Sequence, residues 1–465
     1  MSQYDVVVIG GGPGGSAAAK QAARRGAKVC LAESHHLGGT CLNVGCIPTK
    51  AMLHGSEVLW QSRHMDVFGI VSGEPQVNGP GFMKRVRDFV DDLRAGLDKK
   101  MADFEGIDFV RGRGSLADDH AVRIEQADGE MTVSGESIVI ASGSKPGRPG
   151  FLPWDSPRVM TSREAVGLKE LPESILILGG GIIGCEFATF YAEMGVRTYL
   201  VEMMDRLLNL FPHQEASRRV RDSLEQRGVE VIVSRKLEKI DADDDELHCV
   251  LEDGRTIDVS HALIAVGRKA VLDDIGIERA GVETKDGIIP VDEHCRSNVR
   301  HIYAVGDVAE KRQFAHLAER MGRVAGENAA GYELRDDRRV VPSGVYTHPQ
   351  VAMVGDDEES ARSRCQDVTV RRLSLESSAT AQAYDETNGE VKLVIDAETG
   401  AIYGGLWIGP PAIDLIHEVV LAMRAGLSLA DIYQTIHAHP TLQEMLYEVS
   451  EEWVNERLRS TGAKP

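Results

Sequence analysis

The stretch Val6–Glu33 has the sequence VVVIGGGPGGSAAAKQAARRGAKVCLAE. A segment with the same pattern, ILILGGGIIGCEFATFYAEMGVRTYLVE, occupies Ile175–Glu202, at a constant offset of 169 residues (position 6 to position 175). Each copy predicts a short apolar strand, a glycine-rich turn, a helix and a second strand that ends on a carboxylate. The matched positions are Gly10, Gly12, Gly15 and Glu33 in the first copy and Gly179, Gly181, Gly184 and Glu202 in the second. Ordinary glycine-rich turns of α/β packing do not require an acid at the same offset in both copies.

The repeated pattern predicts two dinucleotide sites. Its glycines let the main chain approach a pyrophosphate, the helix N-terminus faces that charge, and the terminal carboxylate accepts from ribose hydroxyls. In the second copy, Glu202 favours NAD over NADP because a carboxylate repels a 2′-phosphate. The following Met203, Met204 and Asp205 supply no arginine pair to receive such a phosphate, and Arg206 stands alone.

The segment Gly38–Lys50, GGTCLNVGCIPTK, places Cys41 and Cys46 close behind the first copy. A flavin accepts electrons from one carrier and donates them to another, so we expect FAD in the first copy, between NAD and a thiol pair. Residues five apart in a regular helix have Cα atoms roughly 8–9 Å apart, whereas a disulfide needs about 4.4–6.8 Å. The two cysteines therefore bond only if the helix is distorted, and Gly45 and Pro48 favour this. Two buried free thiols are the alternative.

An acid within the second fingerprint predicts an ion pair. Glu186 falls where the first copy has Ala17, inside an otherwise apolar helix, and such an acid calls for a basic partner. Lys50 follows the cysteines on a helix that has to touch the flavin, so we expect a Lys50–Glu186 pair near the reactive edge of the ring. An exposed glutamate and a solvated lysine are the alternative.

The C-terminal segment HAHPTLQE contains a candidate base. His439 and Glu444 flank a proline-containing turn that leads into a helix, and an imidazole held by a carboxylate is a common base for thiol chemistry. His437 competes for the role but precedes the rigid turn, which favours a structural function. A helix-capping role for His439 is the alternative.

Composition narrows the class of protein. The chain has 465 residues and a formal charge of -20, from 52 Lys and Arg against 72 Asp and Glu, which disfavours nucleic acid and anionic membranes as partners. Long apolar runs and a basic leader are missing from the sequence, and seven scattered cysteines do not suggest a secreted disulfide framework. We expect a cytoplasmic enzyme, and the spacing of potential ligands predicts no metal site.

Four motifs together resemble the pyridine nucleotide–disulfide oxidoreductase family, and within it most closely the dihydrolipoyl dehydrogenase branch. They are GGTCLNVGCIPTK, the twin fingerprints, IYAVGD at 302–307 and HPTLQE at 439–444. The resemblance covers essentially the whole chain. It implies an α/β fold with two Rossmann-like dinucleotide-binding domains and a C-terminal α+β dimerisation domain. The expected boundaries are 1–148 for FAD with the redox disulfide, 149–270 for NAD, 271–340 for a central domain completing the FAD site, and 341–465 for dimerisation.

The resemblance also implies roles for single residues. Cys41 is the thiol that meets the substrate and Cys46 the thiol against the flavin, while His439 is the base oriented by Glu444. Lys50 and Glu186 pair beside flavin N5. The remaining expected FAD-site residues are Gly10, Gly12, Gly15, Glu33, Gly39, Thr40, Ser142, Gly143, Asp307, His316 and Leu317, and the NAD-site residues are Gly179, Gly181, Gly184, Glu202 and Gly267.

The implied reaction is oxidation of a protein-bound dihydrolipoyl group, through the Cys41–Cys46 disulfide and FAD, with NAD+ as acceptor. A homodimer with shared active sites is expected, and the lipoyl group arrives on a separate protein. A related disulfide or metal reductase is the first rival. The ending STGAKP has no cysteine pair, which argues against a metal reductase. The arginines that would bind the phosphate of NADP are missing, which argues against an NADP-dependent disulfide reductase. A non-catalytic flavoprotein subunit is the second rival. The presence of Cys41, Cys46, His439 and Glu444 together argues against it, because such a subunit does not need all four residues. Departures from the family pattern are Thr49, Gln350 and the segment 374–390.

Overall fold

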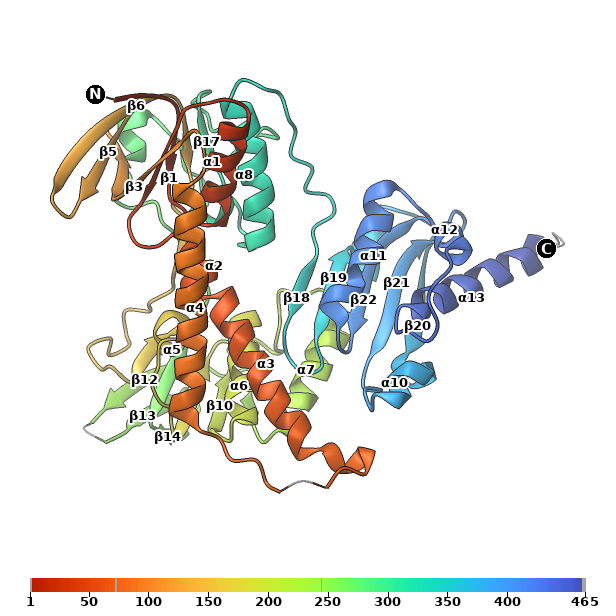
Figure 1. The fold of residues 1–465 in the computed structure, drawn as a ribbon. Coiled ribbons are helices and arrows are strands. Elements are labelled where there is room, and N and C mark those ends of the chain that lie inside the picture. The colour runs from red at the N-terminus through yellow and green to blue at the C-terminus, as the bar shows by residue number, and fades with distance from the viewer. Residues whose placement is uncertain (1, 72, 244, 462–465) are drawn as a thin grey trace. The chain divides into compact units, whose positions relative to one another are not determined.

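The computed structural model describes residues 2–71, 73–243 and 245–461, which divide into two compact units (Figure 1). Unit 1 comprises residues 1–52, 77–171 and 263–337, and unit 2 comprises residues 53–76, 172–262 and 338–465. The chain therefore passes between the units several times. The boundaries expected from the sequence stay a prediction.

Unit 1 is built on a mainly parallel sheet. Its parallel strands are β3 (Ile107–Arg111), β2 (Val29–Glu33), β1 (Ser2–Ile9), β6 (Gly129–Ile140) and β17 (Ile302–Ala304), in that order. The strands read as continuous apolar runs because helices cover them, and all five residues of β2 are buried. The carboxyl ends of β1 and β6 thus lie at one edge, which is where open α/β sheets bind ligands.

The first half of β6 extends beyond the parallel sheet into an antiparallel ribbon. It pairs with β5 (Ala121–Gln126), which pairs with β4 (Arg113–Leu116). The turn between β4 and β5 consequently lies beside Gly135 in the middle of β6, away from the carboxyl end of that strand.

Two helices of unit 1 pack closely side by side, α1 (Pro13–Arg24) and α8 (Ala315–Ala329) (Figure 1). A Cβ atom on Gly322 would lie 2.1 Å from the Gly14 carbonyl oxygen, and one on Gly326 would lie 2.4 Å from that of Ala18. Gly322 and Gly326, one helical turn apart on α8, therefore allow the two helices to lie this close together. The other elements of unit 1 are α2 (Gly39–Val44), α4 (Gly79–Ala102), β7 (Ser144–Pro146), β8 (Val159–Thr161), α5 (Ser162–Ala165), β16 (Arg268–Ala270), η2 (Ile277–Ala280) and η3 (Gly306–Val308).

Unit 2 opens with the second copy of the fingerprint. Its sheet includes, in order, β11 (Glu230–Ile232), β10 (Arg197–Val201), β9 (Ser174–Leu178) and β15 (His261–Ile264), and β8 follows β15. The helices of this part are α6 (Ile182–Glu193) and α7 (Gln214–Gln226). Ile175 pairs with Thr198, as Val6 pairs with Val29 in unit 1, so the sequence offset is also a structural offset. An antiparallel sheet of β12 (Leu237–Ala242), β13 (Leu247–Leu251) and β14 (Thr256–Val259) follows.

The C-terminal part of unit 2 is an antiparallel sheet covered by helices. The strand order is β18 (Ser343–Val345), β19 (Val351–Gly355), β22 (Ile402–Ile408), β21 (Glu390–Asp396) and β20 (Val368–Ser374). Trp407 and Trp453 belong to the apolar core beneath it. The helical elements are η1 (Met65–Phe68), α9 (Glu358–Arg362), η4 (Leu375–Ser377), α10 (Ala379–Ala383), α11 (Ala412–Ala425), α12 (Leu429–Gln434) and α13 (Glu444–Thr461), and α3 (Cys46–Arg63) crosses the division between units.

This architecture confirms the expected fold class, two Rossmann-like folds followed by a C-terminal α+β part. The divergent segment 374–390 forms the end of β20, η4 and α10. Among the described residues, the helices are all too short or too polar to cross a bilayer.

The α1–α8 contact provides a stability test. Gly322→Ala should lower the free energy of unfolding by about 1–3 kcal/mol, because the new methyl group meets main-chain atoms that cannot move aside. Gly96→Ala, in the exposed interior of α4 with no described atom within 4 Å, should instead raise it by about 0.5–1 kcal/mol through helix propensity. Thermal unfolding of the flavin-loaded protein measures both, and a higher Tm for G322A than for G96A contradicts the packing argument.

Candidate active site

The two glycine turns share one close contact. A Cβ atom on Gly15 would lie 1.8 Å from the carbonyl oxygen of Gly10, and one on Gly184 would lie 1.8 Å from that of Gly179. Gly10 and Gly179 themselves have φ of 103° and 111°, where side chains are strained. Each helix can therefore begin directly beneath the end of its strand.

The two terminal carboxylates are held in the same way. Glu33 accepts hydrogen bonds from the main-chain N–H of Gly11 at 2.7 Å and of His35 at 2.8 Å. Glu202 accepts from Gly180 at 2.6 Å and Met204 at 2.7 Å, which are the positions 169 residues further on. An ionised carboxylate offers about four acceptor positions, so each oxygen retains capacity for a ribose hydroxyl.

The residues present fit two dinucleotides. At the middle glycines there is space, because the nearest described atom to a Cβ on Gly12 would be the Cα of Gly39 at 4.0 Å, and around Gly181 the described part of the chain has none within 4 Å. The helices α1 and α6 begin at these two glycines. Their first N–H groups face this space, which suits the negative charge of a pyrophosphate.

The helix that carries the cysteines is interrupted between them. α2 ends at Val44 and α3 begins at Cys46, and Gly45 between them has φ -142° and ψ -114°. Thr49 fixes the start of α3 by donating its N–H and its hydroxyl to the Gly45 carbonyl, at 3.1 Å and 2.6 Å. The structure thus places a break at the residue where the spacing of the two cysteines requires one.

The two cysteine side chains are thiols in contact with each other. A hydrogen bond between Cys41 and Cys46, together with burial, raises the pKa of the Cys41 thiol, while the nearby Lys50 ammonium acts in the opposite direction. The raised pKa keeps the proton on Cys41 at neutral pH. Formation of a disulfide between them stays a prediction.

A partly buried arginine that the sequence did not single out lies beside this pair. Arg268 donates to the Ser144 hydroxyl and carbonyl, both at 2.8 Å, and to the Thr40 hydroxyl at 3.4 Å. Ser144 in turn donates to Asp307, the acid of the IYAVGD motif. Burial lowers the pKa of Arg268, and the charges of Asp307 and Cys46 oppose that shift. Thr40, Asp307 and the cysteines thus meet around one cation.

The remaining predicted FAD-site residues lie in unit 1. Ser142 donates its hydroxyl to the Val271 carbonyl at 2.8 Å, and the next residue, Gly143, has φ 72°. His316 opens α8 and stacks on Phe314 with ring centroids 5.3 Å apart, and Leu317 beside it is buried. Gly39, φ 55°, begins α2.

Gly267, predicted as an NAD-site residue, falls in unit 1 together with the FAD residues. Its carbonyl accepts from Gly147 N at 2.9 Å where β16 pairs with β7. Its contact with NAD stays a prediction.

Glu186 is buried on α6, with 3% of its surface exposed, and accepts a hydrogen bond from the Tyr346 N–H at 3.1 Å. The alternative of an exposed glutamate is thereby excluded. Lys50 lies on α3 in unit 1 and Glu186 in unit 2, so their pairing stays a prediction.

The candidate base is oriented and accessible. His439 Nδ1 lies 2.9 Å from Glu444, whose other oxygen accepts from Thr441 N at 2.7 Å. These two bonds hold the pKa of Glu444 below its usual value, so that it stays an anion into mildly acidic solution. The His439 side chain is 80% exposed, whereas that of His437 is 7% exposed and bonded to Glu418 at 3.0 Å. Of the two histidines, His439 alone is open to a reactant.

Comparison with known proteins identifies the family. The model of the pyridine nucleotide-disulphide oxidoreductases matches residues 4–322, and the model of their dimerisation domain matches residues 341–450. The chain belongs to this family. It is accordingly an oxidoreductase that uses FAD and NAD, and its dimerisation domain indicates a homodimer.

Similar proteins match along nearly the whole chain. Dihydrolipoyl dehydrogenases of Chlorobaculum parvum and Chlamydia trachomatis are 39% and 36% identical, covering 97% and 96% of this chain and equal shares of their own. Among solved structures, LpdA of Mycobacterium tuberculosis has a TM-score of 0.90 at 25% identity, over 97% of this chain and 99% of its own. The Cu(II) complex of the HOCl-induced flavoprotein disulfide reductase RclA of Escherichia coli has 0.88 at 28%, over 97% and 100%.

Replacing the second carboxylate tests the NAD site. Glu202→Ala should lower kcat/KM for NAD+ by about tenfold to a hundredfold, because charge-assisted hydrogen bonds of about 1.5–3 kcal/mol are lost, with little change in kcat. Relative use of NADP+ should rise because the repulsive charge is gone. Asp205→Ala, three positions along and exposed, is the control and should behave as the parent; equal losses in both variants speak against a specific role for Glu202.

Replacing Lys50 tests the electrostatics of the thiol pair. Lys50→Met should raise the pKa of Cys41 further and slow its alkylation by iodoacetamide in the reduced protein by roughly three- to tenfold at fixed pH. Lys50→Arg keeps the charge and should retain most of the rate. Mass spectrometry of the Cys41 peptide over time gives the rates, and identical rates in the methionine and arginine variants contradict the proposed effect.

Proposed function

We propose that the protein is a dihydrolipoyl dehydrogenase that oxidises a dihydrolipoyl group carried by a separate protein, with NAD+ as acceptor. The observation that carries the proposal is the contact between the Cys41 and Cys46 thiols at a helix break directly behind the first dinucleotide turn. Full-length similarity to dihydrolipoyl dehydrogenases supports the choice of substrate.

The proposed reaction begins with thiol–disulfide exchange. His439, oriented by Glu444, removes a proton from one substrate thiol, and the thiolate attacks Cys41 of the Cys41–Cys46 disulfide. The S–S bond of the protein breaks and Cys46 leaves as a thiolate, which the charges of Lys50 and Arg268 favour. The second substrate thiolate then displaces Cys41, so that the substrate leaves as a disulfide and the protein holds two electrons on its dithiol.

The dinucleotide sites complete the proposed cycle. Glu33 and Glu202 would hold the riboses of FAD and NAD, and the N-terminal ends of α1 and α6 would face their pyrophosphates. The bound flavin would supply two-electron chemistry between the dithiol and the nicotinamide.

The base is proposed to act in the partner subunit's active site. His439 lies in the dimerisation domain, 341–450, and is exposed in the single chain. Unit 2 contains it, whereas Cys41 and Cys46 lie in unit 1. A shared site gives the exposed imidazole a surface that excludes water. The cytoplasm is the proposed location, because the scattered spacing of the seven cysteines does not suggest the disulfide framework of a secreted protein.

A disulfide or metal reductase is the second candidate, favoured by the likeness to RclA. Steady-state turnover with dihydrolipoamide and NAD+, with glutathione disulfide and NADH, and with Hg(II) and NADH separates the two. Turnover with dihydrolipoamide should exceed the others by orders of magnitude. Faster reduction of glutathione disulfide or Hg(II) overturns the proposed function.

Substitution of the base tests the mechanism. His439→Gln should lower the rate of dihydrolipoamide oxidation at least a hundredfold, since proton transfer by a positioned base contributes about 10²–10⁴. Reduction of ferricyanide by NADH should be unaffected, because it needs no proton from the substrate thiol. Glu444→Gln should cost less, and His437→Gln should leave the mechanism intact. A parallel loss of ferricyanide reduction in H439Q points to misfolding and contradicts the assigned role.

A further inference from the structure

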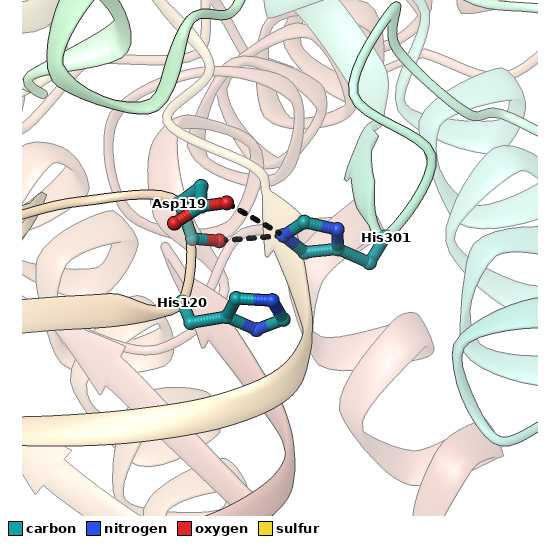
Figure 2. A group of neighbouring side chains, drawn as sticks. All are labelled: Asp119, His120 and His301. Carbon is teal, nitrogen blue, oxygen red and sulfur yellow. Dashed lines mark hydrogen bonds and ion pairs between the residues drawn. The ribbon is translucent and has the colours of Figure 1, made fainter.

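Two histidines and an aspartate distant in sequence meet at the surface of unit 1 (Figure 2). Asp119 and His120 lie in the turn between β4 and β5, and His301 lies immediately before β17. One ligand atom from each residue lies within 4.8 Å of the others. We propose that Asp119, His120 and His301 bind a divalent cation of the zinc, copper or nickel class.

The hydrogen bond of the His120 ring leaves one nitrogen lone pair available for a metal. His120 donates from Nδ1 to the carbonyl of Gly135 at 2.9 Å, so its Nε2 keeps the lone pair. Metal-binding histidines commonly donate their second nitrogen to a main-chain carbonyl in this way, which fixes the tautomer and the ring orientation.

The second ring faces two oxygens of one residue. His301 Nε2 lies 2.8 Å from the Asp119 carbonyl and 3.9 Å from its carboxylate, as the dashed lines in Figure 2 show. When a cation binds, the ring proton moves to Nδ1 and the Nε2 lone pair becomes the ligand. Bonds of about 2.0–2.2 Å to nitrogen and oxygen put neighbouring ligands about 3.0–3.5 Å apart. The carboxylate of Asp119, at 3.9 Å from Nε2, therefore has to move closer to the ring when a cation binds.

Binding requires one change, an opening of the ring stack. The imidazoles of His120 and His301 are parallel within 2°, with centroids 4.0 Å apart. An imidazole lone pair lies in the plane of its ring, so two parallel rings do not aim at one ion. A rotation of one side chain is sufficient, and both residues lie at the surface, where such rotation meets little resistance.

The main chain of the site is already ordered. Asp118 accepts from the N–H groups of His120 at 2.8 Å and Ala121 at 2.7 Å, which fixes the turn that carries the first two ligands. The ligand types, two imidazoles and a carboxylate, suit cations of intermediate softness. The net charge of -20 favours the approach of any cation.

A second cluster in unit 2 serves as a comparison. His248 is bonded through both nitrogens, to Asp258 at 2.7 Å and Asp243 at 3.0 Å, and these bonds raise its pKa to about 9. The ring is therefore protonated at neutral pH and has no lone pair to offer. A cation has to displace a well-held proton there, which favours the site at His301.

The proposed site is remote from the redox centre. Its anchor, Gly135, lies six residues before Ala141, whose carbonyl faces the first glycine turn, and six residues of strand span roughly 20 Å. A cation bound here links the β4–β5 turn to the chain before β17, across 182 residues of sequence.

Zinc binding to the flavin-loaded protein tests the proposal, in a C41S/C46S background so that the thiol pair does not compete. Isothermal titration with Zn²⁺ should give one site per chain. His301→Gln, His120→Gln and Asp119→Asn should each weaken binding at least tenfold, whereas His248→Gln should keep the parent affinity. Excess Zn²⁺ should also raise the Tm of the parent, because a ligand that binds only the folded state stabilises it, and this rise should vanish in H301Q.

Further outcomes contradict the proposal. A parent that binds no zinc overturns it, as does binding that H301Q and D119N leave within twofold of the parent. Loss of binding in H248Q alone assigns the cation to the other cluster. His54→Gln, at a side chain that is 78% exposed and outside both clusters, is the control for the loss of a surface histidine. The zinc-free Tm of each variant shows whether the fold is retained.

Discussion

The contact between the first and third glycines of each fingerprint is the constraint on which the rest of the structure depends. The 1.8 Å that would separate a Cβ on Gly15 from the Gly10 carbonyl leaves room for hydrogen alone. Because this position is glycine, helix α1 can begin at the edge of the sheet. Its first N–H groups and Glu33 then face the same dinucleotide site. The second copy repeats the contact at Gly184, with the same consequence for Glu202. Two dinucleotide sites thus follow from one local packing rule used twice.

A second constraint links this scaffold to sulfur chemistry. An unbroken helix would hold Cys41 and Cys46 too far apart, and the break at Gly45 brings their thiols into contact. Contact alone would suppress ionisation, because each thiolate repels the other. Lys50 and the partly buried Arg268 supply positive charge beside the pair. Geometry and charge together place two thiols in contact beside two cations, which is an arrangement suited to thiol–disulfide exchange.

The sequence predicts those features that depend on neighbours along the chain. The glycine turns, the break at Gly45 and the His439–Glu444 contact span five residues or fewer, and the structure contains each of them. Arg268 escaped prediction because its partners Ser144 and Thr40 lie 124 and 228 residues away. His301 and Asp119, 182 residues apart, meet only because β17 adds to β6. An arginine after a glycine turn and a histidine before a short strand carry no local signal of such contacts.

The exposure of His439 bears on the proposed sharing of active sites between two copies of the chain. A carboxylate that is itself held by a hydrogen bond orients the imidazole of His439, yet this side chain is 80% exposed. An exposed imidazole gains little from orientation, since water competes for each of its hydrogen bonds. In the proposed function, a second copy of the chain covers His439, and this residue lies in the dimerisation domain. Association would then be part of the proposed catalytic apparatus, because the single chain leaves the proposed base exposed to water.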